Sequence, residues 1–198
     1  MWILEEQTEH GPNTVGLCVC HVDDFMISGH MDNNIFKRAF DHIKSLYEWG
    51  DWEEGEFDQC GVRVQQLQDS SFRLHQDKYL DELPCLNVSK EARENLDRPL
   101  TAEETTQARG AICKLLWFGT QTGLLILAQV SLLQGRIPTG TPQLRLDINK
   151  SIRTARQTAR IPLRIYCHTN VAFVVWSDSA WAVRVDGSSQ GGYIAAAT

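Results

Sequence analysis

The chain has 198 residues, enough for one domain or for pieces of two, and enough to bury a sizeable core. Hydrophobic residues make up 42% of it and charged residues 22%, a balance that argues against wholesale disorder. The formal net charge of −6 argues against a simple basic nucleic-acid-binding protein. This average conceals a gradient: residues 1–60 carry 3 basic and 13 acidic side chains, whereas residues 141–198 carry 7 basic and 3 acidic ones.

Targeting and redox features predict an intracellular protein without a membrane-spanning segment. The first residues, MWILEE, lack the pattern of a secretory signal peptide. The six cysteines form no C-x-x-C pair and have no histidines at zinc-ligand spacing, so we expect reduced thiols. The 21 uncharged residues 115–135 include glycine, threonine, glutamine and serine, which favours a pair of buried helices over a membrane span.

The first predicted element is a β-hairpin over residues 14–28, in which two apolar runs flank Asp23 and Asp24. Apolar residues on both faces predict a central, buried hairpin. Two adjacent carboxylates at a buried turn repel each other and lose hydration, and a bound Mg²⁺ would relieve both costs. The alternative is a plain turn, where aspartate is favoured for local reasons. We expect the neighbouring His21 to be packed rather than catalytic.

A helix and a second hairpin follow. Asp32 or Asn33 can cap a helix that ends near Glu48, with an apolar stripe at spacings of four and three residues. This stripe consists of Ile35, Ala39, Ile43 and Leu46, and Phe36 and Phe40 widen it. The aromatic residues Trp49, Trp52 and Phe57 are interpreted as core anchors. The next expected elements are strands near 57–67 and 71–76 with a turn at 69–70, and a short helix around 79–83 that Pro84 ends.

The second half of the chain reads as mostly helical. After a linker at 85–100, the capping-box pattern of Thr101 and Glu104 predicts a helix whose stripe breaks at 119–123 and resumes as a second helix over 124–133. A loop at 135–142 precedes an amphipathic helix at 145–160. One face of this helix is basic and consists of Lys150, Arg153, Arg156 and Arg160. Such a face can follow a phosphate backbone, although a solvated surface face is the commoner reason for the pattern.

The C-terminal region predicts one more hairpin. A strong strand over 171–176 ends at Ser177 and Asp178, and a glycine-rich turn at 186–192 precedes a short strand around Tyr193. An acidic residue at the end of a strand is either a metal ligand or a solvated turn residue. Phosphate-binding-loop, nucleophile-elbow and zinc-protease motifs do not occur in the sequence, which disfavours those chemistries.

Taken in order, these segments resemble the reverse transcriptases of copia-type LTR retrotransposons over about residues 14–197. Residues 21–29 (HVDDFMISG) resemble the x-V-D-D hairpin of that family, and residues 74–80 (LHQDKYL) its L-x-Q-x-x-Y-L stretch. The remaining similar segments are 57–64 (FDQCGVRV), 109–117 (RGAICKLLW), 128–133 (AQVSLL), and 176–182 (WSDSAWA) with 189–193 (SQGGY). The last pair is similar to the opening of the family's RNase H domain.

The resemblance implies an RNA-directed DNA polymerase that uses two metal ions. Asp23 and Asp24 would be the palm carboxylates that hold Mg²⁺ (or Mn²⁺) at the primer 3′-hydroxyl and the incoming triphosphate. Gln59 and Gly61 would lie where the family grips the primer, and Asp178 would be the first metal ligand of the RNase H site. The implied partners are an RNA template, a DNA primer, deoxynucleoside triphosphates and the rest of the Pol polyprotein.

The expected fold is therefore α+β in three segments: residues 1–84 as the C-terminal part of a polymerase palm, 85–165 as a helical thumb and connection, and 166–198 as the first β-hairpin of an RNase H-like domain. The family's upstream palm aspartate and its fingers are missing from the 22 residues before Asp23, and His21 stands where the family has an aromatic residue. We expect little or no catalysis from the chain alone. The alternatives are a non-catalytic nucleic-acid-binding remnant and a transposon relic without function.

Overall fold

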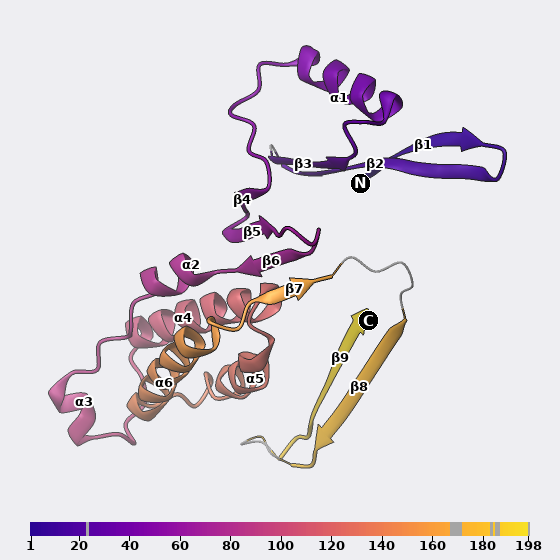
Figure 1. Ribbon diagram of the computed structural model, residues 1–198. Helices are drawn as coiled ribbons and strands as arrows, with labels where there is room; N and C mark the ends of the chain where they lie inside the picture. The colour runs from indigo at the N-terminus through magenta and orange to yellow at the C-terminus, as the bar shows by residue number, and fades with distance from the viewer. Residues whose placement is uncertain (23, 167–171, 183, 185–186, 198) are drawn as a thin grey trace. The chain divides into compact units, whose positions relative to one another are not determined.

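The computed structural model describes residues 1–22, 24–166, 172–182, 184 and 187–197 (Figure 1). It confirms the α+β class, with about 39% helix and 30% strand and with antiparallel sheets. The chain divides into two compact units, Met1–Glu54 and Gly55–Thr198. The expected segment boundaries after residues 84 and 165 stay predictions.

The first unit is a three-stranded antiparallel sheet with one helix. Its strands β1 (Trp2–Thr8), β2 (Gly11–His21) and β3 (Asp24–Gly29) lie in sequence order, and α1 (Asn34–Leu46) follows. The predicted hairpin is present, with His21 opposite Asp24 at its closed end. The prediction that it is central and buried is wrong, because β3 is an edge strand and the side chains of Leu17 and Met26 are about 40% exposed.

One aromatic side chain joins α1 to the sheet. Asn33 caps the helix, as predicted, by accepting hydrogen bonds from the backbone N–H groups of Ile35 and Phe36 at 2.9 and 3.0 Å. The ring of Phe36 lies against Gly16 and Gly29, where an added Cβ would be 2.6 and 2.3 Å from it. The two glycines therefore make the space that lets the helix approach. The predicted stripe is only partly correct: Phe36 is buried as expected, but Ile35 and Leu46 stay exposed.

A cluster of aromatic rings completes the first unit. Trp49 contacts Phe25 edge to face at a centroid distance of 5.1 Å and Trp52 at 5.3 Å, and Trp52 contacts Phe40 at 5.2 Å. The indole N–H of Trp49 donates to the carbonyl of Ile43 at 3.0 Å. These contacts tie the segment after α1 to both the helix and β3. The prediction of core anchors is correct only in part, because Trp52 is 38% exposed and Phe57 lies in β4 of the second unit.

The second unit begins with a four-stranded antiparallel sheet in the order β4 (Glu56–Gln59), β5 (Val62–Gln66), β6 (Phe72–His75) and β7 (Leu163–Ile165). The single strand predicted over 57–67 is wrong, because the chain reverses at Cys60 and Gly61. Both residues have positive φ, at 51° and 76°, as a tight two-residue hairpin turn requires. The predicted turn at 69–70 is present, but β7 was not expected.

Six helical segments lie between β6 and β7 in the chain. They are α2 (Asp77–Glu82), α3 (Lys90–Glu94), α4 (Ala102–Gln121), η1 (Leu124–Ile126), α5 (Leu127–Gly135) and α6 (Pro142–Thr158). Two predicted boundaries are wrong. The first long helix does not break at Gly119 but continues to Gln121. A glycine is needed at 119 because Leu127 packs so closely that an added Cβ would be 2.6 Å from its side chain. The last helix begins at Pro142, since proline suits the first turn.

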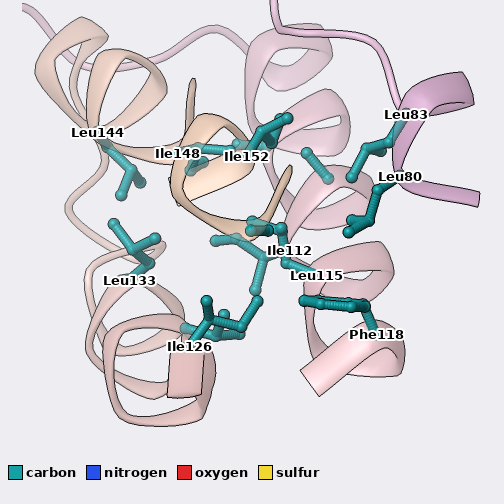
Figure 2. Close-up of a cluster of buried hydrophobic side chains, with 14 of the residues drawn as sticks. Leu80, Leu83, Ile112, Leu115, Phe118, Ile126, Leu133, Leu144, Ile148 and Ile152 are labelled. Carbon is teal, nitrogen blue, oxygen red and sulfur yellow. The ribbon is translucent and has the colours of Figure 1, made fainter. Parts of the chain in front are cut away.

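The main core lies among these helices (Figure 2). Leu115 of α4 and Ile148 and Ile152 of α6 are fully buried, and Leu80 of α2 is 1% exposed. Ala108, Ile112 and Phe118 extend the buried face of α4. The predicted apolar faces of both long helices are thus confirmed, because their repeats of three and four residues place these side chains against one another.

The last element is a two-stranded hairpin of β8 (Phe173–Ala180) and β9 (Gln190–Ala197). Its strands are longer than predicted and most of their side chains are exposed. No helix within the described residues is long and apolar enough to cross a membrane. None of the five described cysteines is in a disulfide, and the sixth, Cys167, lies outside the described residues.

Candidate functional site

The acidic turn between β2 and β3 is the principal candidate site. Val22 has a positive φ of 58° and its side chain is 86% exposed, and Asp24 and His21 are also exposed. The expectation that His21 is packed is therefore wrong. Asp23 lies outside the described residues. Asp24 is exposed to solvent, so burial supplies no reason for its carboxylate to need a cation.

The described residues do not form a complete Mg²⁺ or Mn²⁺ site. No group of three or more His, Cys, Asp or Glu side chains able to hold a metal ion occurs among them. Mg²⁺ retains several waters, and its other ligands are carboxylates and substrate phosphates. At this turn Asp24 is the single carboxylate among the described residues. The described residues at this turn thus supply too few ligands to hold a metal ion by themselves.

The structure places Asp178 in the middle of β8, opposite Gly192, and not at a strand end as predicted. The strand continues to Ala180 because the pairing with β9 extends that far. The carboxylate is exposed and accepts a hydrogen bond from the backbone N–H of Ser179 at 2.8 Å. Asp178 belongs to no group of three or more His, Cys, Asp or Glu side chains able to hold a metal ion among the described residues.

Gln59 and Gly61 lie at the turn between β4 and β5. The amide nitrogen of Gln59 is 3.6 Å from Sγ of Cys60, and Gly61 is exposed. The strands beside the turn are held by Arg63, which donates from Nε and a terminal nitrogen to Oε1 of Glu56 at 3.1 and 2.9 Å. Hydrogen bonds from Gln65 and Arg63 lower the pKa of the Glu56 carboxyl. The strands on both sides of the turn are thus held together by hydrogen bonds, and Gly61 leaves the turn without a bulky side chain.

The basic face of α6 is smaller than predicted. Lys150 and Arg153 are exposed on α6, and Arg160 is exposed two residues past its end; no hydrogen bond or ion pair engages them within the described part of the chain. Arg156 points to α2 instead, where it donates to the carbonyl oxygens of Leu80 and Leu83 at 3.1 and 2.7 Å. The last carbonyls of a helix lack partners within that helix, which explains why an arginine is recruited there.

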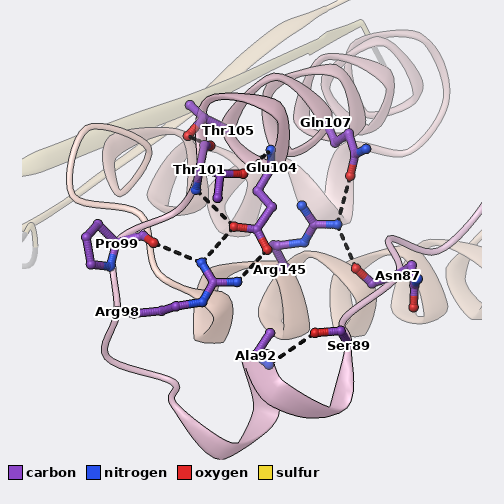
Figure 3. Close-up of polar contacts among 10 residues, drawn as sticks. All are labelled: Asn87, Ser89, Ala92, Arg98, Pro99, Thr101, Glu104, Thr105, Gln107 and Arg145. Carbon is purple, nitrogen blue, oxygen red and sulfur yellow. Dashed lines mark hydrogen bonds and ion pairs between the residues drawn. The ribbon is translucent and has the colours of Figure 1, made fainter.

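The sequence did not predict a polar network that fixes the linker before α4 (Figure 3). Arg145, only 3% exposed, donates to the carbonyl of Asn87 at 2.6 Å and to Oε1 of Gln107 at 2.8 Å. Arg98 donates to both carboxylate oxygens of Glu104 at 2.8 and 2.7 Å. This arginine contact is the main cause that lowers the pKa of Glu104 from 4.5 to about 2.

The network has a structural rather than a chemical role. The capping box of Thr101 and Glu104 was predicted, but the sequence carries no signal that Arg98 would join it. Beside it, the side chain of Asn149 on α6 bonds both the N–H and the carbonyl of Leu86, at 2.7 and 2.8 Å. These bonds hold the linker on α4 and α6 by its backbone, since the linker buries few side chains of its own.

Comparisons with protein-family models, curated proteins and solved structures found no match to this chain.

Proposed function

We propose that the chain is the C-terminal part of a retrotransposon reverse transcriptase of the copia type, followed by the start of an RNase H domain. The observation that carries this proposal is the antiparallel β2–β3 hairpin, in which Asp24 begins β3 opposite His21 at the closed end. Asp23 precedes it in the sequence. The elements after it support the proposal by their order. A helix, a hairpin with a glycine turn, a helical region and a final hairpin follow, as the resemblance implies.

In this proposal each segment has one role. Residues 1–84 would be the palm part, with Asp23 and Asp24 as its catalytic carboxylates and Gln59 and Gly61 at the primer. Residues 85–165 would be the thumb and connection, and residues 166–198 the first hairpin of RNase H, with Asp178 as its first acidic residue. The partners would be an RNA template with a DNA primer, deoxynucleoside triphosphates and the rest of the Pol polyprotein.

The chain alone is proposed to be inactive, because nucleotidyl transfer needs more acidic ligands than the described residues bring together. Purified chain should give no primer extension with Mg²⁺ or Mn²⁺ on an RNA template. The proposed inactivity would be contradicted if this chain extended a primer and the Asp23→Asn variant did not.

The polymerase origin is tested with a longer chain. DNA upstream of this coding sequence should contain, in frame, a strand that bears a further aspartate, and DNA downstream the remainder of an RNase H domain. A protein spanning these parts should extend a primer, and Asp23→Asn or Asp24→Asn should abolish extension. Asp32→Asn is the matched control, because Asp32 is exposed just after the hairpin. Extension unaffected by either hairpin variant would contradict the proposal.

A second function rests on the exposed cations of α6 and of the turn just after it. We propose that a chain without catalysis still binds nucleic acid through Lys150, Arg153 and Arg160, which the described structure leaves unpaired. Replacing Arg153 and Arg160 by alanine should weaken binding to an RNA–DNA duplex and lower the salt slope by about 2. The control replaces the exposed Lys78 and Lys90. Equal losses in both double variants would contradict a site on α6.

A further inference from the structure

The sheet of β4 to β7 has one apolar and one polar face. Because side chains alternate along each strand, the cross-strand register sorts them into rows. Phe57, Val64, Leu74 and Leu163 form a row on the apolar face. On the opposite face, Glu56, Gln65, Arg73 and Arg164 form one row, and Asp58, Arg63 and His75 form the next.

Most charges on this polar face have partners. Arg63 contacts the carboxylates of Glu56 and Asp58 at 2.9 and 3.4 Å. Nδ1 of His75 lies 3.1 Å from a carboxylate oxygen of Asp77. Glu56 shares the row of Arg73 and Arg164, but it lies on β4, and β5 separates it from Arg73 on β6. Asp58 also lies on β4, and Asp77 begins α2.

Arg164 on β7 is held in place by three neighbours. Its Nε donates to Oγ of Ser71 at 3.1 Å, and a terminal nitrogen donates to a carboxylate oxygen of Asp69 at 2.6 Å. Its guanidinium also stacks over the ring of Tyr166 at 4.7 Å. These contacts use two of its five N–H groups, so three remain available in a fixed orientation.

Arg73 on β6 lies directly opposite Arg164 and has no partner of its own. Within the described part of the chain it makes no hydrogen bond or ion pair, and its Nε is shielded from solvent without an acceptor. Like charges directly opposite on neighbouring strands are destabilising, and a buried donor without an acceptor adds a further cost. The cross-strand pair of arginines is therefore an arrangement that an anion would stabilise.

We propose that Arg73 and Arg164 together bind a phosphate group on the polar face of this sheet. Guanidinium groups match the oxygens of phosphate in pairs, and two of them on adjacent strands approach one phosphate from two sides. Asp69 is the carboxylate that contacts Arg164. It accepts from one terminal nitrogen and leaves the remaining terminal N–H groups of Arg164 free. The site is distinct from the exposed cations of α6 and requires neither of the proposed functions.

The direct test observes the arginine Nε–H signals of the full chain by ¹⁵N NMR during titration with inorganic phosphate. The signals of Arg73 and Arg164, assigned from Arg73→Lys and Arg164→Lys, should shift together, whereas sodium chloride at equal ionic strength should leave them unchanged. Arg73→Gln should weaken phosphate binding by about tenfold or more. Arg38→Ala is the matched control, because Arg38 is an exposed arginine on α1, and it should bind phosphate as the original chain does. Shifts spread evenly over all arginines would overturn the proposal.

Stability gives a second readout that does not depend on assignment. In phosphate-free buffer, Arg73→Gln should be as stable as the original chain or more so, because it removes a repulsion. Phosphate should raise the melting temperature of the original chain but not that of the variant. A variant that melts at lower temperature without phosphate would overturn the proposal, since Arg73 would then have a structural role.

The same titration distinguishes the two sources of a phosphate group. If the site takes a phosphate of a nucleic-acid backbone, a single-stranded oligonucleotide should move the same two signals at lower concentration than inorganic phosphate, and phosphate should compete with it. If the site takes a free phosphate or a mononucleotide, the oligonucleotide should leave both signals in place while phosphate moves them. Either result supports the site, and no response to any of these ligands overturns it.

Discussion

The two compact units bury their apolar side chains to very different extents. In the described structure, Phe36 is the one buried core residue of Met1–Glu54, whereas Gly55–Thr198 contains the whole helical cluster around Leu115 and Ile148. Helices α4, α5 and α6 pack against one another, whereas the described part of the first unit contains a single helix, α1, beside its sheet. Most stability therefore comes from the helical unit, although the acidic turn lies in the other.

This contrast also separates two ways of holding a segment. In the first unit, aromatic rings around Trp49 and Trp52 hold the chain after α1. In the second, the linker before α4 is held by hydrogen bonds from Arg145 and Asn149 to its backbone. Ring packing tolerates partial exposure, but a buried arginine must keep its acceptors, so the second unit is the more sensitive to single substitutions.

The largest effect is expected in the helical core. Ile148→Ala should lower the free energy of unfolding by about 2–5 kcal/mol, because it leaves a cavity among α4, α5 and α6. Urea denaturation followed by far-ultraviolet circular dichroism measures the change. Leu125→Ala is the control, since that leucine is 70% exposed, and it should change stability by less than about 0.5 kcal/mol. Similar losses in both variants would mean that the core does not lie where the structure places it.

A smaller effect is expected where α1 meets the sheet. Gly29→Ala should cost about 1–3 kcal/mol locally, because the new Cβ would lie 2.3 Å from the ring of Phe36. Hydrogen exchange of the β2 and β3 amides, read by mass spectrometry, should become faster. Gly50→Ala has no atom within 4 Å of the new Cβ and should leave exchange unchanged. Unchanged protection in Gly29→Ala would show that Phe36 does not lie between the two glycines.

Acid should weaken the second unit through Glu104. Its pKa falls from 4.5 to about 2 in the folded chain, so its stabilising contribution is complete above pH 4.5 and is lost as the pH drops towards 2. Glu104→Gln should remove about 1–2 kcal/mol of this pH-dependent stability, a value reduced for the partial exposure of the Arg98 pair. Urea midpoints at several pH values measure it. Glu103→Gln, in the same helical turn, should keep the pH dependence of the original chain.

The smallest effect compares the caps of the two units. Asn33→Ala and Thr101→Ala each remove one side-chain acceptor at a helix start and should each cost about 1 kcal/mol. The loss of Asn33 should appear as faster hydrogen exchange in the first turn of α1, and that of Thr101 in the first turn of α4. Asn33→Ser retains an acceptor and should restore most of the protection. An Asn33→Ser variant that exchanges as fast as Asn33→Ala would contradict the capping role.

The sequence by itself determined the elements whose signals are local. Hydrophobic repeats placed the buried faces of the long helices, the capping residues Asn33 and Thr101 located two helix starts, and the apolar runs around the acidic pair located the first hairpin. These predictions held because spacing and capping depend on residues within a few positions of one another.

Only the tertiary structure decided which residues meet across long sequence distances. It showed that β7 joins β6 and sets Arg164 opposite Arg73, that Arg156 serves the carbonyls of α2, and that the first hairpin is exposed. None of these follows from local spacing, because each depends on which element fills the space beside a side chain. The same limit applies to the acidic turn: the sequence supplies the carboxylates, but the surrounding fold decides how many ligands gather there.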